Sequence, residues 1–258
     1  MRKSLEGVSP AAPNLLTLAI TGLSVAACDG AAWTGPIGVD QSPSGIYTGS
    51  FTSTVTQPAP ARQAIGVVSE DFDANFLLAQ QHYAGILAVD GISLSGVLIE
   101  YSGRQGVFNG FDGLTTVSID GEVTERDSMF GTYAGDTAEG WFSLAYSETY
   151  EEGAPLELLA GIWSYNESSS GGGVYTITVE IDGGGQLFAT DTAGCLFSGQ
   201  LTAIDDRYSA YRVAINVSVC GEVDGDYSGL AFYQGANEVL QIGSDNGQFA
   251  MAVRLGRL

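Results

Sequence analysis

His82 is the only histidine among the 258 residues, so a Ser-His-Asp or Cys-His arrangement would have to use it. Serine and cysteine triads employ a histidine as their general base. No Gly-x-Ser-x-Gly motif is present, and the nearest match, Gly91 to Gly96, has the wrong spacing. We expect His82 at a strand edge. We predict neither a catalytic residue nor a zinc site, because such sites usually need several histidine or cysteine ligands.

Two aspartate-rich stretches match part of a calcium-binding loop. Residues Asp224 to Gly229 reproduce the first half of an EF-hand, but the twelfth position is Gly235 instead of a glutamate. Residues Asp71 to Asn75 are followed by Phe76, where the loop requires glycine. Aspartates are common in tight turns without a metal. We therefore expect no metal and no other cofactor.

Three pairs of adjacent acids stand out, namely Glu70-Asp71, Glu151-Glu152 and Asp205-Asp206. A glycosidase needs two carboxyl groups about 5–10 Å apart across a cleft. Adjacent residues on a strand point to opposite faces of the sheet, so no such doublet would form the pair by itself. A hydrolase of this kind would have to bring together acids from distant parts of the chain.

Cys195 and Cys220 are the only cysteines after Cys28. Two cysteines in an oxidising compartment usually pair, and a loop of this length would add about 3 kcal/mol to stability. Two buried free thiols are the alternative. Cys195 shares a face with Phe197, whereas Cys220 falls on the polar face of its own segment. A disulfide therefore requires a bulge or a strand end near Gly221.

A period of two dominates the sequence from Gly45 onward. Apolar and polar residues alternate from Tyr175 to Asp182 and from Tyr211 to Val219. This alternation is typical of half-buried antiparallel strands. Asp-Gly and Asn-Gly pairs, which allow the positive φ of tight hairpins, recur along the chain. The sequence predicts an all-β protein with two tandem small antiparallel β-barrel or β-sandwich domains.

The centre of the chain carries the signs of a division into two copies. Pro155 to Leu159 is the one credible helical turn, with proline at a favourable first position. It precedes Gly161-Ile-Trp163, which is similar to Gly45-Ile-Tyr47 at the start of the first expected strand. Two further similarities pair 131–135 with 225–229 and 90–96 with 193–199. We expect β domains at 45–153 and 154–258. The alternative is chance recurrence in a glycine-rich chain that forms one body.

The first 28 residues follow the order that export requires. Arg2 and Lys3 precede the apolar run from Leu15 to Val25, which is too short to span a bilayer. The run ends in Val25-Ala26-Ala27-Cys28, which resembles the lipobox of bacterial lipoproteins. The resemblance implies that 1–27 is a signal peptide, that it is cut before Cys28, and that Cys28 carries the lipid. A buried helix that happens to end in these residues is the alternative.

Residues 28–44 are mostly small, polar or proline, so we expect an acylated tether ahead of the first domain. The predicted location is the bacterial cell envelope, on the periplasmic or the surface side. Asp29 resembles the signal that retains enterobacterial lipoproteins in the inner membrane. Other bacteria read this position differently, so both the inner and the outer membrane stay open.

The composition is acidic and short of lysine. The chain carries a formal charge of −21, and removal of residues 1–27 takes away a net +1 with Arg2, Lys3 and Glu6, which leaves −22. Lys3 is the only lysine, so the remaining chain of 231 residues (258 − 27) has none. Such a surface repels nucleic acid, and we expect no nucleic-acid partner. The simpler interpretation is that the charge keeps the protein soluble. The alternative is that the charge attracts a cation or a basic partner.

The second half resembles a known domain family. The residues that carry the resemblance are Gly194-Cys195, Ser198-Gly199, Tyr211-Arg-Val213, Cys220 and Tyr227-Ser-Gly229. They are similar to a C-terminal domain of uncharacterised proteobacterial lipoproteins, over about 161–258, and this resemblance implies no activity. Gly161-x-Trp163 alone resembles a lipocalin, which would form a single eight-stranded barrel.

These patterns predict a lipid-anchored, non-catalytic binding or structural module of the cell envelope. Its expected partners are the membrane, through the N-terminal lipid, and an envelope protein or a ligand. One alternative is a carboxylate-based glycan hydrolase, which would show two facing carboxylates in a pocket. The other is a lipocalin-like carrier of a small ligand, which would show a wide barrel with an apolar lumen. Four aromatic residues flank the centre and could line a cleft or pack two domains together: Tyr146, Tyr150, Trp163 and Tyr165.

The lipid anchor can be tested at Cys28. Cells grown with radiolabelled palmitate should label the wild-type chain, whereas Cys28→Ser should give unlabelled protein that is uncut or soluble, because the acceptor thiol is gone. Autoradiography after membrane fractionation measures both effects. Label that persists in the Cys28→Ser chain would contradict the assignment.

Overall fold

The computed structural model describes residues 39–54, 61–105, 107–136, 139–153, 155–168 and 174–258. All of them belong to one compact unit. They form sixteen β-strands and four short 3-10 turns, with no α-helix among the described residues. The predicted all-β class is confirmed.

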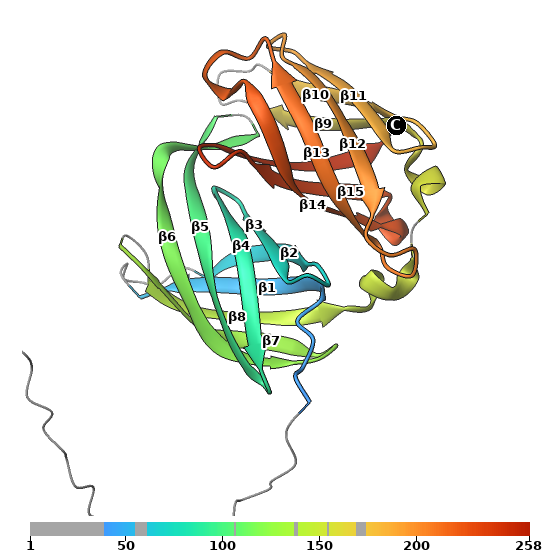
Figure 1. Cartoon of the computed structure of the whole chain (residues 1–258). Helices are drawn as coiled ribbons and strands as arrows, with labels where there is room; N and C mark the ends of the chain where they lie inside the picture. The colour runs from blue at the N-terminus through green and yellow to red at the C-terminus, as the bar shows by residue number, and fades with distance from the viewer. Residues whose placement is uncertain (1–38, 55–60, 106, 137–138, 154, 169–173) are drawn as a thin grey trace, which may run out of the picture. The chain divides into compact units, whose positions relative to one another are not determined.

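The first eight strands form a closed antiparallel ring, which we call the first ring (Figure 1). Its strands are β1 (Gly45–Ser53), β2 (Ala61–Val68), β3 (Asp73–Leu78), β4 (Gln81–Asp90), β5 (Ser93–Gln105), β6 (Phe108–Thr124), β7 (Ser128–Gly135) and β8 (Glu139–Ser147). Each strand pairs with the next in the chain. The ring closes because β8 pairs with β1, with Ile46 opposite Ser147.

The last eight strands repeat this order in the second ring. Its strands are β9 (Gly161–Ser168), β10 (Val174–Ile181), β11 (Gln186–Asp191), β12 (Leu196–Ala203), β13 (Ala210–Ser218), β14 (Gly225–Gln234), β15 (Val239–Asp245) and β16 (Ala250–Arg257). Closure comes from the pairing of β16 with β9, where Gly256 lies opposite Ser164. β16 also pairs with β6, with Met251 opposite Phe108, so the two rings share one hydrogen-bonded sheet.

Short 3-10 turns join the rings. They are η1 (Glu148–Glu152) and η2 (Leu156–Leu159), and two more, η3 (Gly221–Val223) and η4 (Gly235–Asn237), lie within the second ring. The helical turn predicted after Pro155 is confirmed as η2, with Pro155 as its N-cap residue. The predicted boundary between residues 153 and 154 falls between η1 and η2. Whether each half folds alone stays a prediction.

The sequence similarities fall on both equivalent and non-equivalent strands. Gly45 to Tyr47 opens β1 and Gly161 to Trp163 opens β9, the first strand of each ring, and both aromatic residues are fully buried. In contrast, 131–135 lies on β7, the seventh strand of its ring, whereas 225–229 lies on β14, the sixth. The third similarity is offset by one strand in the same way. Only the first similarity therefore matches the ring order, and duplication stays a prediction.

Aromatic side chains fill both lumens. In the first ring they include Tyr47, Phe51, Phe76, Tyr83, Tyr133 and Phe142, and in the second Trp163, Phe197, Tyr211 and Tyr227. Glycine lets the strands bend tightly around these lumens. At Gly140 and Gly229, a Cβ atom would overlap the carbonyl oxygens of Thr52 and Gly243 respectively. This close approach accounts for part of the high glycine content.

The last residues of the predicted tether are bound to the first ring. Asp40 Oδ1 accepts a hydrogen bond of 2.7 Å from the Gly91 amide, and the Gln41 amide donates to the Gly91 carbonyl at 2.8 Å. Glu125 donates its amide to Gln41 Oε1 at 3.1 Å. The segment from Asp40 to Ser44 is therefore part of the folded body, and the predicted tether shortens to 28–39.

Cys195 and Cys220 form a disulfide with a Cα–Cα distance of 4.7 Å. β13 ends at Ser218, and Val219 adopts a left-handed conformation with φ of 63°. The Cys220 amide then donates to Asp224 Oδ1 at 2.7 Å. The expected strand end near Gly221 is confirmed, and it turns Cys220 from the outer face toward Cys195.

Val219 carries backbone strain, because a β-branched residue disfavours positive φ, and its side chain is exposed. Val219→Asn should raise the free energy of unfolding by about 1 kcal/mol, since asparagine tolerates this conformation. Urea unfolding of the oxidised chain measures the change. The control is Val174→Asn on β10, an exposed valine without positive φ, where stability should stay equal or fall. A loss of stability at both positions would contradict the assignment of strain.

Candidate functional site

The lumens offer little space for a ligand. The ring of Phe51 stacks at centroid distances of 5.2 Å from Tyr83 and 5.6 Å from Phe142. The hollow that is lined by Phe51, Phe142 and Met129 does not admit a water molecule. In the second ring, Trp163 is fully buried and its Nε1–H donates to the Leu159 carbonyl at 2.8 Å. A lipocalin-like carrier needs an open apolar lumen, and the described residues enclose none of that kind.

A polar cluster occupies one end of the first lumen. Arg62 Nη1 donates to Gln81 Oε1, and Gln81 Nε2 donates to Glu100 Oε1 at 2.5 Å. Arg62 Nη2 also lies 3.4 Å from the Tyr133 hydroxyl. Glu100 is 3% exposed, and burial followed by the charge of Glu100 raises the pKa of Tyr83. The charges of Arg62 and Glu100 are linked through Gln81, so a structural role accounts for the cluster.

His82 is buried where the rings meet. It is the second residue of β4, which has hydrogen-bonded neighbours on both sides, so it does not lie on an edge strand. Its Nε2 lies 2.5 Å from Asn75 Oδ1, and because an amide oxygen only accepts, the proton is on Nε2. Nδ1 has no hydrogen-bond partner among the described residues. Burial lowers the pKa of His82 from 6.5 to about 3, so the ring is neutral near pH 7.

The second ring contacts His82 through Gly243 on β15. A Cβ atom at Gly243 would lie 3.4 Å from His82 Cε1 and 3.1 Å from Asn75 Oδ1, so a larger side chain would push the rings apart. On the same strand Asp245 accepts a hydrogen bond of 2.7 Å from the Tyr101 hydroxyl of the first ring. A buried apolar cluster extends the contact, and its members are Ile46, Val67, Tyr150, Ala210, Leu230 and Phe232.

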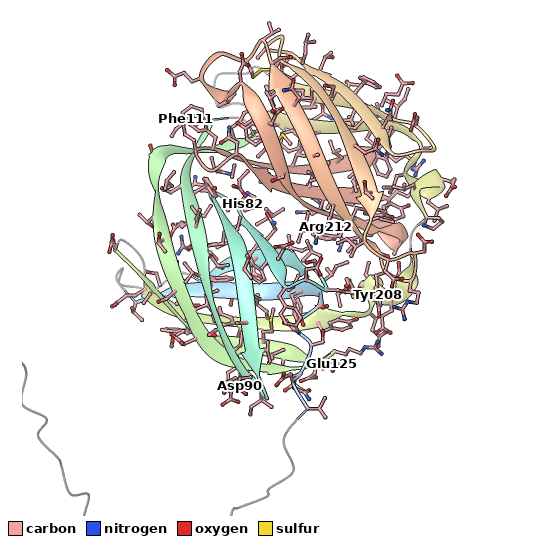
Figure 2. The ribbon with its side chains drawn as sticks, in the orientation of Figure 1. His82, Asp90, Phe111, Glu125, Tyr208 and Arg212 are labelled. Carbon is pink, nitrogen blue, oxygen red and sulfur yellow. A yellow bond between two sulfur atoms is a disulfide. The ribbon has the colours of Figure 1, made fainter. Side chains whose placement is uncertain are left out.

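A groove of about 460 Å³ opens beside this contact, and we call it the inter-ring groove. Strands β3 and β4 form one wall and strands β12 to β15 the other. Its principal residues are Asp73, Asn75, Ile86, Thr202, Arg212, Ser228 and Asp245. Figure 2 shows His82 and Arg212 on the facing sides of the two rings. Small residues such as Ala84 and Ala214 leave the space open.

Arg212 spans the groove as a bridge between the rings. Its Nη1 donates to Asp73 Oδ2 at 2.9 Å and its Nη2 to Asp71 Oδ2 at 2.5 Å. The pKa of Arg212 is raised, and the hydrogen bond to Asp73 is the largest cause. Burial acts in the opposite direction, and the hydrogen bond to Asp71 is the next cause that raises the pKa. Since the arginine side chain is 45% exposed, these ion pairs contribute little to the stability of the fold. Their main effect is to fix the positions of the charged groups in the groove.

The groove carboxylates are engaged by neighbouring donors. Asp73 pairs with Arg212, and Asp245 Oδ1 accepts from Tyr101 and from the Gly247 amide at 3.1 Å. General acid–base work on a glycoside needs one carboxyl group to protonate a leaving group and a second to act opposite it. Both groove aspartates are thus held by partners within the fold.

The acidic doublets lie in turns and in η1, so the expectation that they sit on strands was wrong. They lie in connections between strands, where side chains are not restricted to alternate faces of a sheet. Asp205 pairs with Arg207 at 2.6 Å, and this hydrogen bond lowers the pKa of Asp205 to about 2. Glu151 pairs with Arg126 at 3.0 Å, and Asp71 pairs with Arg212. One member of each doublet is thus held by an arginine.

The partial calcium motifs are used by the fold in other ways. Asp226 lies in β14 and accepts from Asn216 Nδ2 at 2.7 Å, while Asp224 accepts from the Cys220 amide. This stretch is therefore mostly a strand and not a loop. Among the described residues, one grouping brings three possible metal ligands within 4.8 Å, namely Asp191, Cys195 and Cys220. Its two sulfur atoms are bonded to each other, so it lacks the thiolates that bind metals.

The four aromatic residues at the centre of the chain have separate roles. Tyr146 and Tyr150 line a pocket between the rings, whereas Trp163 fills the second lumen and Tyr165 packs against its core.

Sequence reasoning missed Arg212, whose only signal was its place on the polar face of an alternating strand. Cys28 lies outside the described residues, so its lipidation stays a prediction. Helices long and apolar enough to cross a membrane are not found in the described part of the chain.

No protein-family model matches the chain, and a search of the curated proteins found no match. Among solved structures, the chain is similar to the isotype 1 transferrin binding protein B from serogroup B Neisseria meningitidis, with 9% sequence identity and a TM-score of 0.25. The match covers 79% of this chain and 60% of that chain, which is less than two thirds of its length. A TM-score this low carries no argument about function.

The buried imidazole predicts a loss of stability in acid. The unfolded chain binds a proton at His82 near pH 6.5, whereas the folded chain resists it until about pH 3, so stability falls as the pH drops through this range. Between pH 7 and pH 5 the loss should be about 2 kcal/mol. No other histidine titrates there.

Urea unfolding at the two pH values measures this loss. His82→Gln is the matched control, because glutamine can still donate to Asn75 and does not titrate. Between pH 7 and pH 5, the free energy of unfolding of the His82→Gln chain should fall by about 2 kcal/mol less than that of the wild-type chain. Equal pH dependence in both chains would show that His82 is not the buried group responsible.

Proposed function

We propose that this chain is a non-catalytic binding module of the bacterial cell envelope, anchored by a lipid on Cys28, and that it holds a segment of a partner protein in the inter-ring groove. One observation carries the proposal. The lumens of both rings are filled, whereas the groove between the rings is open and carries exposed side chains.

The groove has the chemistry of a recognition surface. Ile86 is 62% exposed on one wall and offers an apolar contact, while Thr202 and Ser228 offer hydroxyl groups on the other. Arg212 and its two aspartates supply a fixed charge pattern. Binding sites commonly combine apolar surface with a few convergent polar groups. Since the chain carries a charge of −21, the partner is a protein segment and not a nucleic acid.

The hydrolase alternative is weaker on this geometry. Its two carboxylates would have to face each other in a pocket, but Asp73 is paired with Arg212 and Asp245 is hydrogen-bonded to Tyr101. The carrier alternative is weaker because the described hollow of the first ring does not admit water. The lipobox resemblance at Cys28 supports the envelope location, and the attachment of Asp40 and Gln41 to the first ring would keep the body near the anchor.

The proposal can be tested by photo-crosslinking in the native membrane. We would place p-benzoylphenylalanine at Ile86 of the full acylated chain and, as a control, at Phe188, which is exposed on β11 outside the groove. The Ile86 position should give a discrete adduct with one envelope protein, and Phe188 should not. Ala214→Trp, which fills the groove from the opposite wall, should reduce the adduct several-fold. Identical adducts at both positions, or none at Ile86, would refute the groove as the binding site.

A further inference from the structure

A smaller pocket also lies between the rings, and we call it the arginine pocket. Its volume is about 240 Å³, and its principal residues are Leu77, Ala79, Val107, Gln241, Val253 and Arg254. The end of β3 and the turn after it supply one wall, and strands β15 and β16 supply another. Along β15, Gly243 separates Gln241 from Asp245, which lines the inter-ring groove. The arginine pocket is therefore separate from that groove.

Arg254 differs from the other arginines because it has no partner. It forms no ion pair and no side-chain hydrogen bond with the part of the chain that the structure describes. The other arginines with described side chains each bond to another residue, and they are Arg62, Arg126, Arg207, Arg212 and Arg257. Acidic residues outnumber basic ones by 30 to 9. The position of Arg254, and not a shortage of acids, therefore leaves its charge unpaired.

Gln241 lies directly opposite Arg254 in the β15–β16 ladder. Side chains at such paired positions share a face of the sheet, with Cβ atoms about 5 Å apart. Gln241 is 7% exposed, and its amide has no hydrogen-bond partner among the described residues. The amide is not fully enclosed, so a molecule in the pocket can reach it. A buried amide without a protein partner needs water or a ligand to complete its hydrogen bonds.

The remaining lining of the arginine pocket is mostly apolar. Leu77, Val107 and Val253 are buried and present aliphatic surface. Two further polar residues take no part in binding, because Asn109 Oδ1 is sealed from solvent and the Tyr165 hydroxyl donates to Glu167 Oε2 at 3.0 Å. At about 30 Å³ for a water-sized group, the volume of 240 Å³ holds about eight such groups. The pocket therefore suits a small ligand with one polar end.

We propose that the arginine pocket binds the carboxylate of a short aliphatic acid. A guanidinium group donates two parallel hydrogen bonds to a carboxylate, and Arg254 has no competing acid to displace. The adjacent Gln241 amide donates a further hydrogen bond from its NH₂ group. The aliphatic chain of the acid then lies against Leu77 and Val107. The inference stands independently of the inter-ring groove and of the proposed function.

Two other anionic ligands fit less well. Inorganic phosphate carries more negative charge, which the strongly acidic chain repels, and it gains nothing from the apolar lining. The C-terminus of a peptide has the required carboxylate. Its last amide groups, however, would lie against aliphatic side chains that offer them no hydrogen-bond partner. A short aliphatic acid has neither difficulty.

The test is a titration of the full chain in a non-ionic detergent, followed by NMR of the ligand. The probe is pentanoate, its neutral match is pentanamide, and inorganic phosphate and Nα-acetylalanine are the other arms. Pentanoate should bind at least about tenfold more tightly than each of the other three, because it alone combines a carboxylate with an uninterrupted aliphatic chain. No binding of pentanoate, or an equal or higher affinity for any of the other three, would overturn the proposal.

Matched variants locate the binding. Arg254→Gln should weaken pentanoate at least about tenfold, because it removes the charged donor from an exposed position. Gln241→Met keeps the length of the side chain and should weaken pentanoate about threefold, because it removes one neutral hydrogen bond. The controls are Arg207→Gln, which makes the same charge change elsewhere, and Gln186→Met at an exposed position of β11. Both controls should bind like the wild-type chain. If Arg207→Gln loses as much affinity as Arg254→Gln, the site is not the arginine pocket.

Discussion

Ring closure determines what the rest of this molecule can do. Pairing of β8 with β1 and of β16 with β9 joins the last strand of each ring to its first. Rings of eight strands have a lumen that side chains can fill, and here stacked aromatic residues fill it. Lumen glycines such as Gly140 allow the tight bending. Because the lumens are occupied, the surfaces open to another molecule are the outer faces and the place where the rings meet.

The contact between the rings is specific because a glycine meets a buried histidine. Gly243 lets β15 approach His82 and Asn75, and the Tyr101–Asp245 hydrogen bond fixes the register nearby. Phe108 strengthens the connection, since it comes from the first ring and stacks on Phe197 in the second core. The inter-ring groove is the space left beside this contact. Its shape depends on the contact, although its chemistry comes from other residues.

Sequence reasoning predicted what is local. Alternation over Tyr211 to Val219 predicted a strand, and the mismatch between Cys195 and Cys220 predicted a strand end that the left-handed Val219 provides. It did not predict which strands face each other across the two rings, because an outward residue such as Arg212 has the same pattern whether it meets solvent or a second ring. The acidic doublets were expected on strands for a different reason, because alternation does not mark where a strand ends and its connection begins.

The most direct test of two self-contained rings is whether the second one folds by itself. A fragment of residues 154–258 with its disulfide intact keeps the β16–β9 closure and loses Phe108 and the pairing with β6. Near-ultraviolet circular dichroism through a urea titration should show a cooperative transition, at a lower midpoint than that of the whole chain. A featureless, sloping curve without cooperativity would contradict the account, since it would mean that the second ring cannot fill its lumen without the first.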